Sequence, residues 1–182
     1  MIVTPRYKSR QENTLYNIEE RLNTLEQKNA IRDLKHRVYC LCIDKIVSGD
    51  TQVEKLVSEH LSNDVIADFS GFPLIQGRDE VEQFLFKHVP SVLSYSQHRV
   101  TNDIISLHEN RASAIWYLDC PVVFRDNNPL KIKGSGIISG RYEEEYVFEN
   151  NIWKWSKITA LLDTVESFTK NWNQSQQLTT NR

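Results

Sequence analysis

Residues 38–50 have the sequence VYCLCIDKIVSGD, an apolar helical segment that carries Tyr39 and Asp44. At about 100° per residue, one apolar stripe passes through Val38 and a second arc has Tyr39 and Asp44 at its edges. An amphipathic surface helix needs only one stripe, so the second arc is covered as well or faces a cavity. The carboxylate favours the cavity, because burying an ionised Asp without a partner is costly. The alternative is that Asp44 faces water beside Lys45, near the end of the helix.

Helical periodicity extends from this segment toward the N-terminus as far as about Leu15 and ends at Gly49. A short helix is predicted over residues 52–61, then a strand over 65–69. A third helix is predicted from Gly77 to residue 89, just before Pro90. The prediction therefore contains three N-terminal helices, over about residues 15–49, 52–61 and 77–89.

After Pro90 the apolar residues alternate with a period of two, which is typical of strands. The pattern predicts long strands over the following ranges: about 94–108, 112–125, 131–149 and 152–165. Asn150-Asn151 is typical of a tight hairpin turn. Helices followed by antiparallel strands indicate an α+β fold with the helices on one face of the sheet. We expect one domain over residues 14–168, with flexible tails at 1–13 and 169–182.

The chain has 182 residues, a net charge of −2 and three cysteines. This charge gives no basic field for nucleic acid. No apolar run is long enough to cross a membrane, and residues 1–8 contain no apolar signal core, so we expect a cytoplasmic protein. The cysteines have no zinc or disulfide spacing, and we expect buried reduced thiols. For the acidic run Glu143–Glu145, the outer face of the sheet is favoured over a metal site.

His98 lies in the segment QHRVTN, residues 97–102, where alternation places His98, Val100 and Asn102 on one face. An imidazole titrates near neutral pH, and one of its nitrogens can be held by a partner while the other does chemistry. A carboxylate such as Asp44 would fix the tautomer and raise the basicity of the ring. The alternative is a structural or merely exposed histidine.

Taken together, the following segments resemble the SnoaL-like branch of the NTF2-like superfamily, nearest to the scytalone dehydratase and bile acid 7α-dehydratase subgroup: Tyr39…Asp44, residues 77–80, His98…Asn102, residues 114–119 and Gly140-x-Tyr142. The resemblance covers roughly residues 29–167. It implies a cone-shaped α+β barrel in which three helices pack on a curved, mostly antiparallel sheet. It also implies a hydrophobic pocket without metal or organic cofactor.

The resemblance implies catalytic roles for three residues: His98 as base, Asp44 as its orienting partner and Tyr39 as the donor to an enolate oxygen. Four further residues are predicted to bind the substrate, namely Asn102, Trp116, Asp119 and Tyr142. Asp119 is the nearest match to a further carboxylate that relatives carry. A slip of one residue would place Cys120 there instead and reverse the side-chain direction.

The resulting functional hypothesis is a cofactor-independent lyase, cyclase or isomerase of secondary metabolism. It would act by acid–base chemistry on a hydrophobic polycyclic, aromatic or terpenoid-like carbonyl compound. Two other functions remain open: a non-catalytic binding or assembly module, and a structural subunit such as the small subunit of aromatic-ring dioxygenases. We expect a homodimer or homotrimer. The apolar stripe Leu15, Ile18, Leu22 and Leu25 would cover a neighbouring subunit or the protein's own sheet.

Overall fold

The computed structural model describes residues 10–168, with the side chains of 10–16 and 166 left out of the description. Most of both predicted tails therefore lies outside the described residues. Residues 10–13, which were predicted to belong to the N-terminal tail, are helical. The first helix thus begins earlier than the apolar pattern indicates, because its opening turns are polar.

The helical elements form three groups. The first is a long rod of three consecutive segments, α1 Arg10–Asp33, the π-helical η1 Leu34–Cys40 and α2 Leu41–Val47. The second is the 3₁₀ turn η2 Thr51–Val53 with α3 Glu54–Glu59. The third contains α4 Arg78–Gln83, π-helical η3 Phe84–His88 and α5 Val89–Val92. The three predicted helices are thus confirmed. Asp50 caps the start of the second group, because its side chain accepts a hydrogen bond from the Gln52 backbone N–H.

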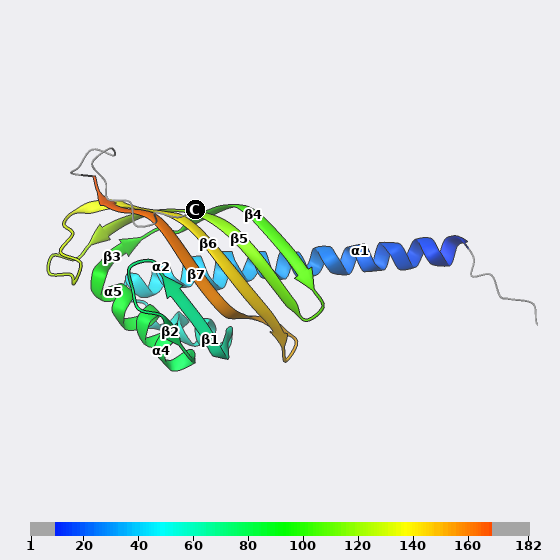
Figure 1. The fold of residues 1–182 in the computed structure, drawn as a ribbon. Coiled ribbons are helices and arrows are strands. Elements are labelled where there is room, and N and C mark those ends of the chain that lie inside the picture. The colour runs from blue at the N-terminus through cyan, green and yellow to red at the C-terminus, as the bar shows by residue number, and fades with distance from the viewer. Residues whose placement is uncertain (1–9, 169–182) are drawn as a thin grey trace, which may run out of the picture.

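Seven strands form one curved sheet that lies over the helices (Figure 1). They are β1 Leu61–Phe69, β2 Ile75–Gln76, β3 Leu93–Ser96, β4 Arg99–His108, β5 Arg111–Phe124, β6 Ser135–Glu149 and β7 Ile152–Ser167. Their order is β2-β1-β7-β6-β5-β3, and β4 also pairs with β5. Among the strands of residues 10–168, only the β1–β7 pairing is parallel, so the α+β fold with a mostly antiparallel sheet is confirmed.

The predicted strand over residues 94–108 is two strands, because β3 ends at Ser96 and β4 begins at Arg99. The backbone N–H of His98 is bound by the Asp44 carboxylate at 3.0 Å. A side chain of the helical rod therefore holds this interruption of the sheet edge.

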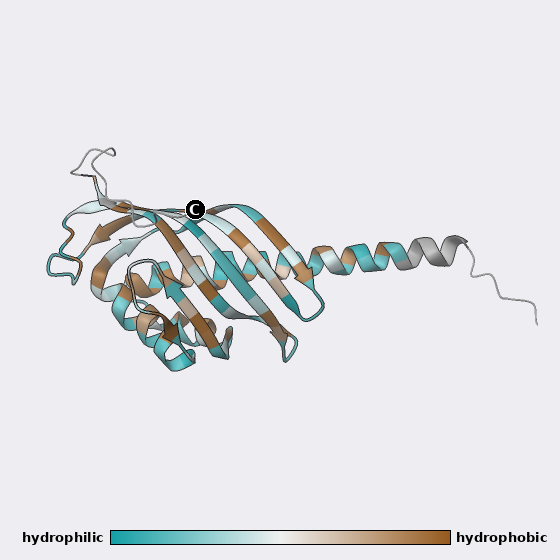
Figure 2. Ribbon diagram, viewed as in Figure 1, coloured by the Kyte–Doolittle hydropathy of each residue, from teal (hydrophilic) through white to brown (hydrophobic). Residues whose placement is uncertain are grey.

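The core lies between the helices and the concave face of the sheet. Along β5 every second side chain is buried, as the alternation predicted. Figure 2 shows hydrophobic and hydrophilic residues interspersed along the strands of the sheet. Gly140 allows a close approach of β6 and β7, since a Cβ there would lie 2.2 Å from the carbonyl oxygen of Leu161. The pairing of β6 with β7 also shifts register beside this glycine.

The outer part of α1 extends beyond the sheet (Figure 1). Its apolar residues Ile18, Leu22 and Leu25 are 51%, 53% and 58% exposed. The prediction that this stripe covers the protein's own sheet is therefore wrong for these three residues, because they lie on the part of α1 that extends beyond the sheet. Contact with a neighbouring subunit stays a prediction, and the side chain of Leu15 is not described. In residues 10–168, no helix has the length and apolar character needed to cross a membrane.

Candidate active site

Asp44 and His98 form the polar centre of the site. His98 Nδ1 lies 2.6 Å from Asp44 Oδ1, and the side chain of His98 is 9% exposed. Ser96 donates its hydroxyl to the same Asp44 oxygen at 2.6 Å. With the His98 backbone N–H on Oδ2, the carboxylate is held on both oxygens. It is therefore placed to fix the imidazole, which leaves Nε2 as the nitrogen without a carboxylate partner.

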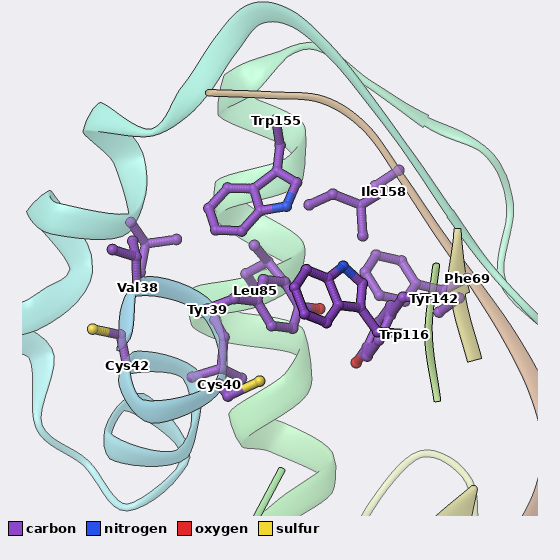
Figure 3. Close-up of a cluster of buried hydrophobic side chains, with 14 of the residues drawn as sticks. Val38, Tyr39, Cys40, Cys42, Phe69, Leu85, Trp116, Tyr142, Trp155 and Ile158 are labelled. Atoms are coloured by element: carbon purple, nitrogen blue, oxygen red, sulfur yellow. The ribbon is translucent and has the colours of Figure 1, made fainter. Parts of the chain in front are cut away.

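Tyr39 packs beside this pair. Its ring lies edge-on to His98, with centroids 6.0 Å apart, and 5.5 Å from the ring of Tyr142. Figure 3 shows Tyr39 on its helix, directed at Tyr142 and among the buried aromatic side chains. Tyr39, His98 and Tyr142 all line one cavity of about 110 Å³, together with apolar residues such as Leu118 and Ile138. Asp44 is not among the lining residues and stands behind the imidazole.

The surroundings of His98 favour its protonated form. Burial lowers the pKa of the imidazole, but the nearby Cys120 thiol and the hydrogen-bonded Asp44 carboxylate outweigh burial and raise the pKa to about 9. At neutral pH the imidazole is therefore largely protonated, and it becomes able to accept a proton as the pH approaches 9.

Tyr39 is kept as a neutral phenol. Burial raises its pKa above the usual range, and a hydrogen bond with Tyr142 offsets only part of that effect. A phenol that stays protonated can donate a hydrogen bond to an oxygen that gains negative charge.

A buried ionic network lies behind the two tyrosines. The Lys35 Nζ lies 2.6 Å from Glu144 Oε1 and 3.9 Å and 3.4 Å from the ring centroids of Tyr39 and Tyr142. The Tyr146 hydroxyl donates to the other oxygen of Glu144. Sequence reasoning missed both charged residues. The only available signal was the alternation within residues 143–145, which separates Glu144 from its two neighbours.

Three predicted substrate-binding residues are outside the cavity. Asn102 is exposed, because a register shift between Thr101 and Ile104 and a positive φ of 53° at Asn102 interrupt the alternation. Trp116 is buried elsewhere and donates its Nε1 hydrogen to the Tyr146 hydroxyl at 3.3 Å. The structure therefore does not bring these two residues to the cavity.

Asp119 is exposed, on the face of β5 opposite the cavity, so the structure does not bring it to the cavity either. The register places Cys120 inward, and this thiol lines the cavity. Tyr142 is the one predicted binding residue that does line it. All three cysteines are free and buried, as predicted.

His88 also lines the cavity. Its ring stacks on Phe84 with centroids 5.2 Å apart. Within the described part of the chain, its buried Nε2 has no hydrogen-bond partner. This nitrogen is therefore a polar atom available to a ligand in an otherwise apolar region.

The outer acidic residues are not part of this site. Arg141 Nε lies 2.8 Å from Glu143 Oε1, as expected for the outer face of the sheet. Among residues 10–168, no three His, Cys, Asp or Glu side chains are grouped so as to hold a metal ion.

The model of the SnoaL-like domain family matches residues 23–159, so the chain belongs to this family. No protein of curated function matches the sequence. A proposed scytalone dehydratase of Novosphingobium aromaticivorans has a similar structure, with 15% identity, coverage of 87% of this chain and 97% of the other, and a TM-score of 0.65. A proposed aromatic ring hydroxylase of the same species is also similar in structure. It shares 24% identity, with coverage of 74% of this chain and 87% of the other and a TM-score of 0.62.

A hexachlorocyclohexane dehydrochlorinase of Novosphingobium barchaimii is similar as well. It shares 19% identity, with coverage of 88% of this chain and 95% of the other and a TM-score of 0.62. At identities below 25%, this structural similarity establishes the NTF2-like fold alone. The reaction of this protein has to be argued from its own cavity.

Proposed function

We propose that this protein is an acid–base lyase that removes a proton beside the carbonyl group of a hydrophobic substrate and eliminates a leaving group from the adjacent carbon. The observation that carries the proposal is the 2.6 Å contact between Asp44 and His98, with the imidazole lining an apolar cavity. The fold shared with a dehydrochlorinase and with a proposed scytalone dehydratase supports an elimination.

In this proposal His98 Nε2 takes the proton from carbon, because Nδ1 is held by Asp44. The Tyr39 hydroxyl donates a hydrogen bond to the carbonyl oxygen as the enolate forms. The electron pair then forms the new C=C bond, and the leaving group departs with the proton that His98 Nε2 took from carbon. Only unprotonated His98 acts as the base, so the rate should rise with pH until it levels near the His98 pKa of about 9.

Proton exchange tests the proposal without a known substrate. Hydrophobic cyclic ketones would be incubated with the protein in D₂O, and loss of the proton beside the carbonyl would be followed by NMR. Exchange should be faster with the wild type than with His98→Ala or Asp44→Asn. His108→Ala, which removes an exposed histidine of the same sheet, is the matched control. Equal exchange rates in the wild type and His98→Ala would refute the assignment of His98 as the base.

A non-catalytic binding module is the second candidate, and the apolar lining of the cavity favours it. In that case ketones would bind, as measured by quenching of tryptophan fluorescence, yet no exchange above the uncatalysed rate would follow. Binding and exchange measured on the same ketones separate the two functions.

We further propose a homo-oligomer, a dimer or a trimer, in which the exposed residues Ile18, Leu22 and Leu25 contact a neighbouring copy. Sedimentation of the full chain and of a variant with Leu22→Glu and Leu25→Glu would test this surface. The variant should have a smaller mass in solution. An unchanged mass would place the contact elsewhere.

A further inference from the structure

His98 lies between the end of β3 and the start of β4, beside Cys120 of β5. Ser96 pairs with Val122 and Arg99 pairs with Asp119, so the same register places His98 opposite Cys120. The Gln97 N–H donates to the Pro121 carbonyl oxygen at 3.0 Å. The adjacent pair, His98 and Cys120, is therefore of the non-hydrogen-bonded kind, in which side chains approach most closely.

The side chains of this pair share one environment. Both line the same cavity, and Asp44 holds Nδ1 of the imidazole, so Nε2 is the nitrogen left for the thiol. Three further titratable groups surround the pair, Tyr39 and Cys40 from η1 and Tyr142 from β6. Burial raises the pKa of each of these three groups, so they are uncharged at neutral pH. The charged groups nearby are Asp44 and, behind the two tyrosines, the ion pair of Lys35 with Glu144.

The other two cysteines provide an internal comparison. Burial raises the pKa of Cys40 to about 12 despite the nearby Lys35, and burial also raises the pKa of Cys42. The Cys42 thiol donates to the Arg37 carbonyl oxygen at 3.2 Å. Neither of these thiols lines the cavity. Of the three cysteines, Cys120 alone combines a cavity position with an imidazole partner.

We propose that Cys120, His98 and Asp44 form a nucleophilic triad that captures small apolar α,β-unsaturated carbonyl compounds as thioethers. In the reactive form of the pair the thiol proton resides on His98 Nε2, so a thiolate lies beside an imidazolium that Asp44 stabilises. The sulfur forms a bond to the β-carbon of the ligand, while the C=C electron pair moves toward the carbonyl oxygen. The proton on His98 then passes to the α-carbon. The product is a saturated thioether, and the addition needs no oxidant or reductant.

This inference goes beyond the elimination proposed above, because the addition breaks no C–H bond and needs no leaving group. The two proposals can fail separately. Absence of proton exchange together with thiol addition at Cys120 would contradict only the lyase proposal. Proton exchange without thiol addition would contradict only the triad.

Alkylation of the full-length protein by 2-cyclohexen-1-one tests the triad. Intact mass would report the adduct, and peptide mapping would separate Cys120 from Cys40 and Cys42. We expect Cys120 to react at least tenfold faster than either of the others. His98→Gln and Asp44→Asn should slow the Cys120 reaction at least tenfold, and Cys40→Ala, a buried thiol outside the cavity, should leave it unchanged. Reaction at Cys120 no faster than at Cys40 would overturn the proposal.

A second measurement on the wild type covers the case in which the His98 variant does not fold. At pH values below its pKa, an unassisted thiol reacts about tenfold faster for each unit by which the pH rises, because only the thiolate attacks. A thiol paired with the imidazole should instead react at a nearly constant rate between pH 7 and 8.5. A tenfold rise for each unit across this interval would show an isolated thiol and overturn the triad.

Discussion

Lys35 and Glu144 form an ion pair with 2.6 Å between Nζ and Oε1, and neither side chain has any exposed surface. The two residues are 109 positions apart in the chain and join the helical rod to the centre of the sheet. Taking two charges out of water is costly, and the cost is recovered only when both partners are present. The ammonium group also lies against the rings of Tyr39 and Tyr142, so the pair supports the wall of the cavity.

Removing one partner of this pair should destabilise the protein strongly. Lys35→Met should lower the free energy of unfolding by about 3–5 kcal/mol, because it leaves the Glu144 carboxylate buried without a cation. Urea denaturation would measure the change. The double variant Lys35→Met with Glu144→Gln should lose less than the sum of the single variants. The exposed pair Lys55 and Glu59 is the control, and Lys55→Met should change little. Additive effects at Lys35 and Glu144 would contradict the coupling.

Stability should fall as the pH rises through the titration of His98. The pKa of His98 increases from 6.5 to about 9 on folding, so between these values the folded protein binds more protons than the unfolded chain. The contribution is complete below pH 6.5 and lost above about 9, and it amounts to roughly 3 kcal/mol. Urea denaturation at pH 6, 7.5 and 9 would follow it. Thiols also titrate at high pH, so His98→Asn is the reference. A parallel pH dependence in that variant would show that His98 is not responsible.

Tyr39→Phe should separate catalysis from packing. The variant keeps the ring contacts with His98 and Tyr142 and removes only the hydroxyl. If the hydroxyl stabilises the enolate, exchange of the proton beside the carbonyl should slow by about 10²-fold, with ketone binding nearly unchanged. Tyr95→Phe removes an exposed hydroxyl and serves as control. Weaker binding with an unchanged exchange rate would assign Tyr39 to binding alone.

His88→Phe should have opposite effects on ligand binding and on stability. The substitution removes a buried nitrogen without a partner in the described part of the chain, so the free energy of unfolding should rise by about 1 kcal/mol. A ketone whose oxygen is bound by this nitrogen should bind about tenfold more weakly, as measured by tryptophan quenching. His108→Phe, at an exposed position, is the comparison for added ring surface. Unchanged affinity would mean that the ligand's polar group lies elsewhere.

The contact of Asp44 with His98 could be expected from the two apolar arcs of the helix and from the resemblance to the SnoaL-like family, although His98 lies between β3 and β4 and not within a strand. A helix with two apolar arcs must face a covering layer, and an alternating strand presents one face to it. Asn102 could not be placed in the same way. A single extra residue in one strand, with Asn102 in a left-handed conformation, reverses the side chains that follow.

Local periodicity alone therefore determined the α+β fold, the helical rod and the strand that precedes the His98 site, because helical and strand repeats are encoded by neighbouring residues. Only the tertiary structure decided that Cys120 rather than Asp119 enters the cavity, since strand register depends on pairing between distant segments. It also decided that Lys35 meets Glu144. Charges 109 residues apart can be brought together only by packing of the complete sheet against the helix.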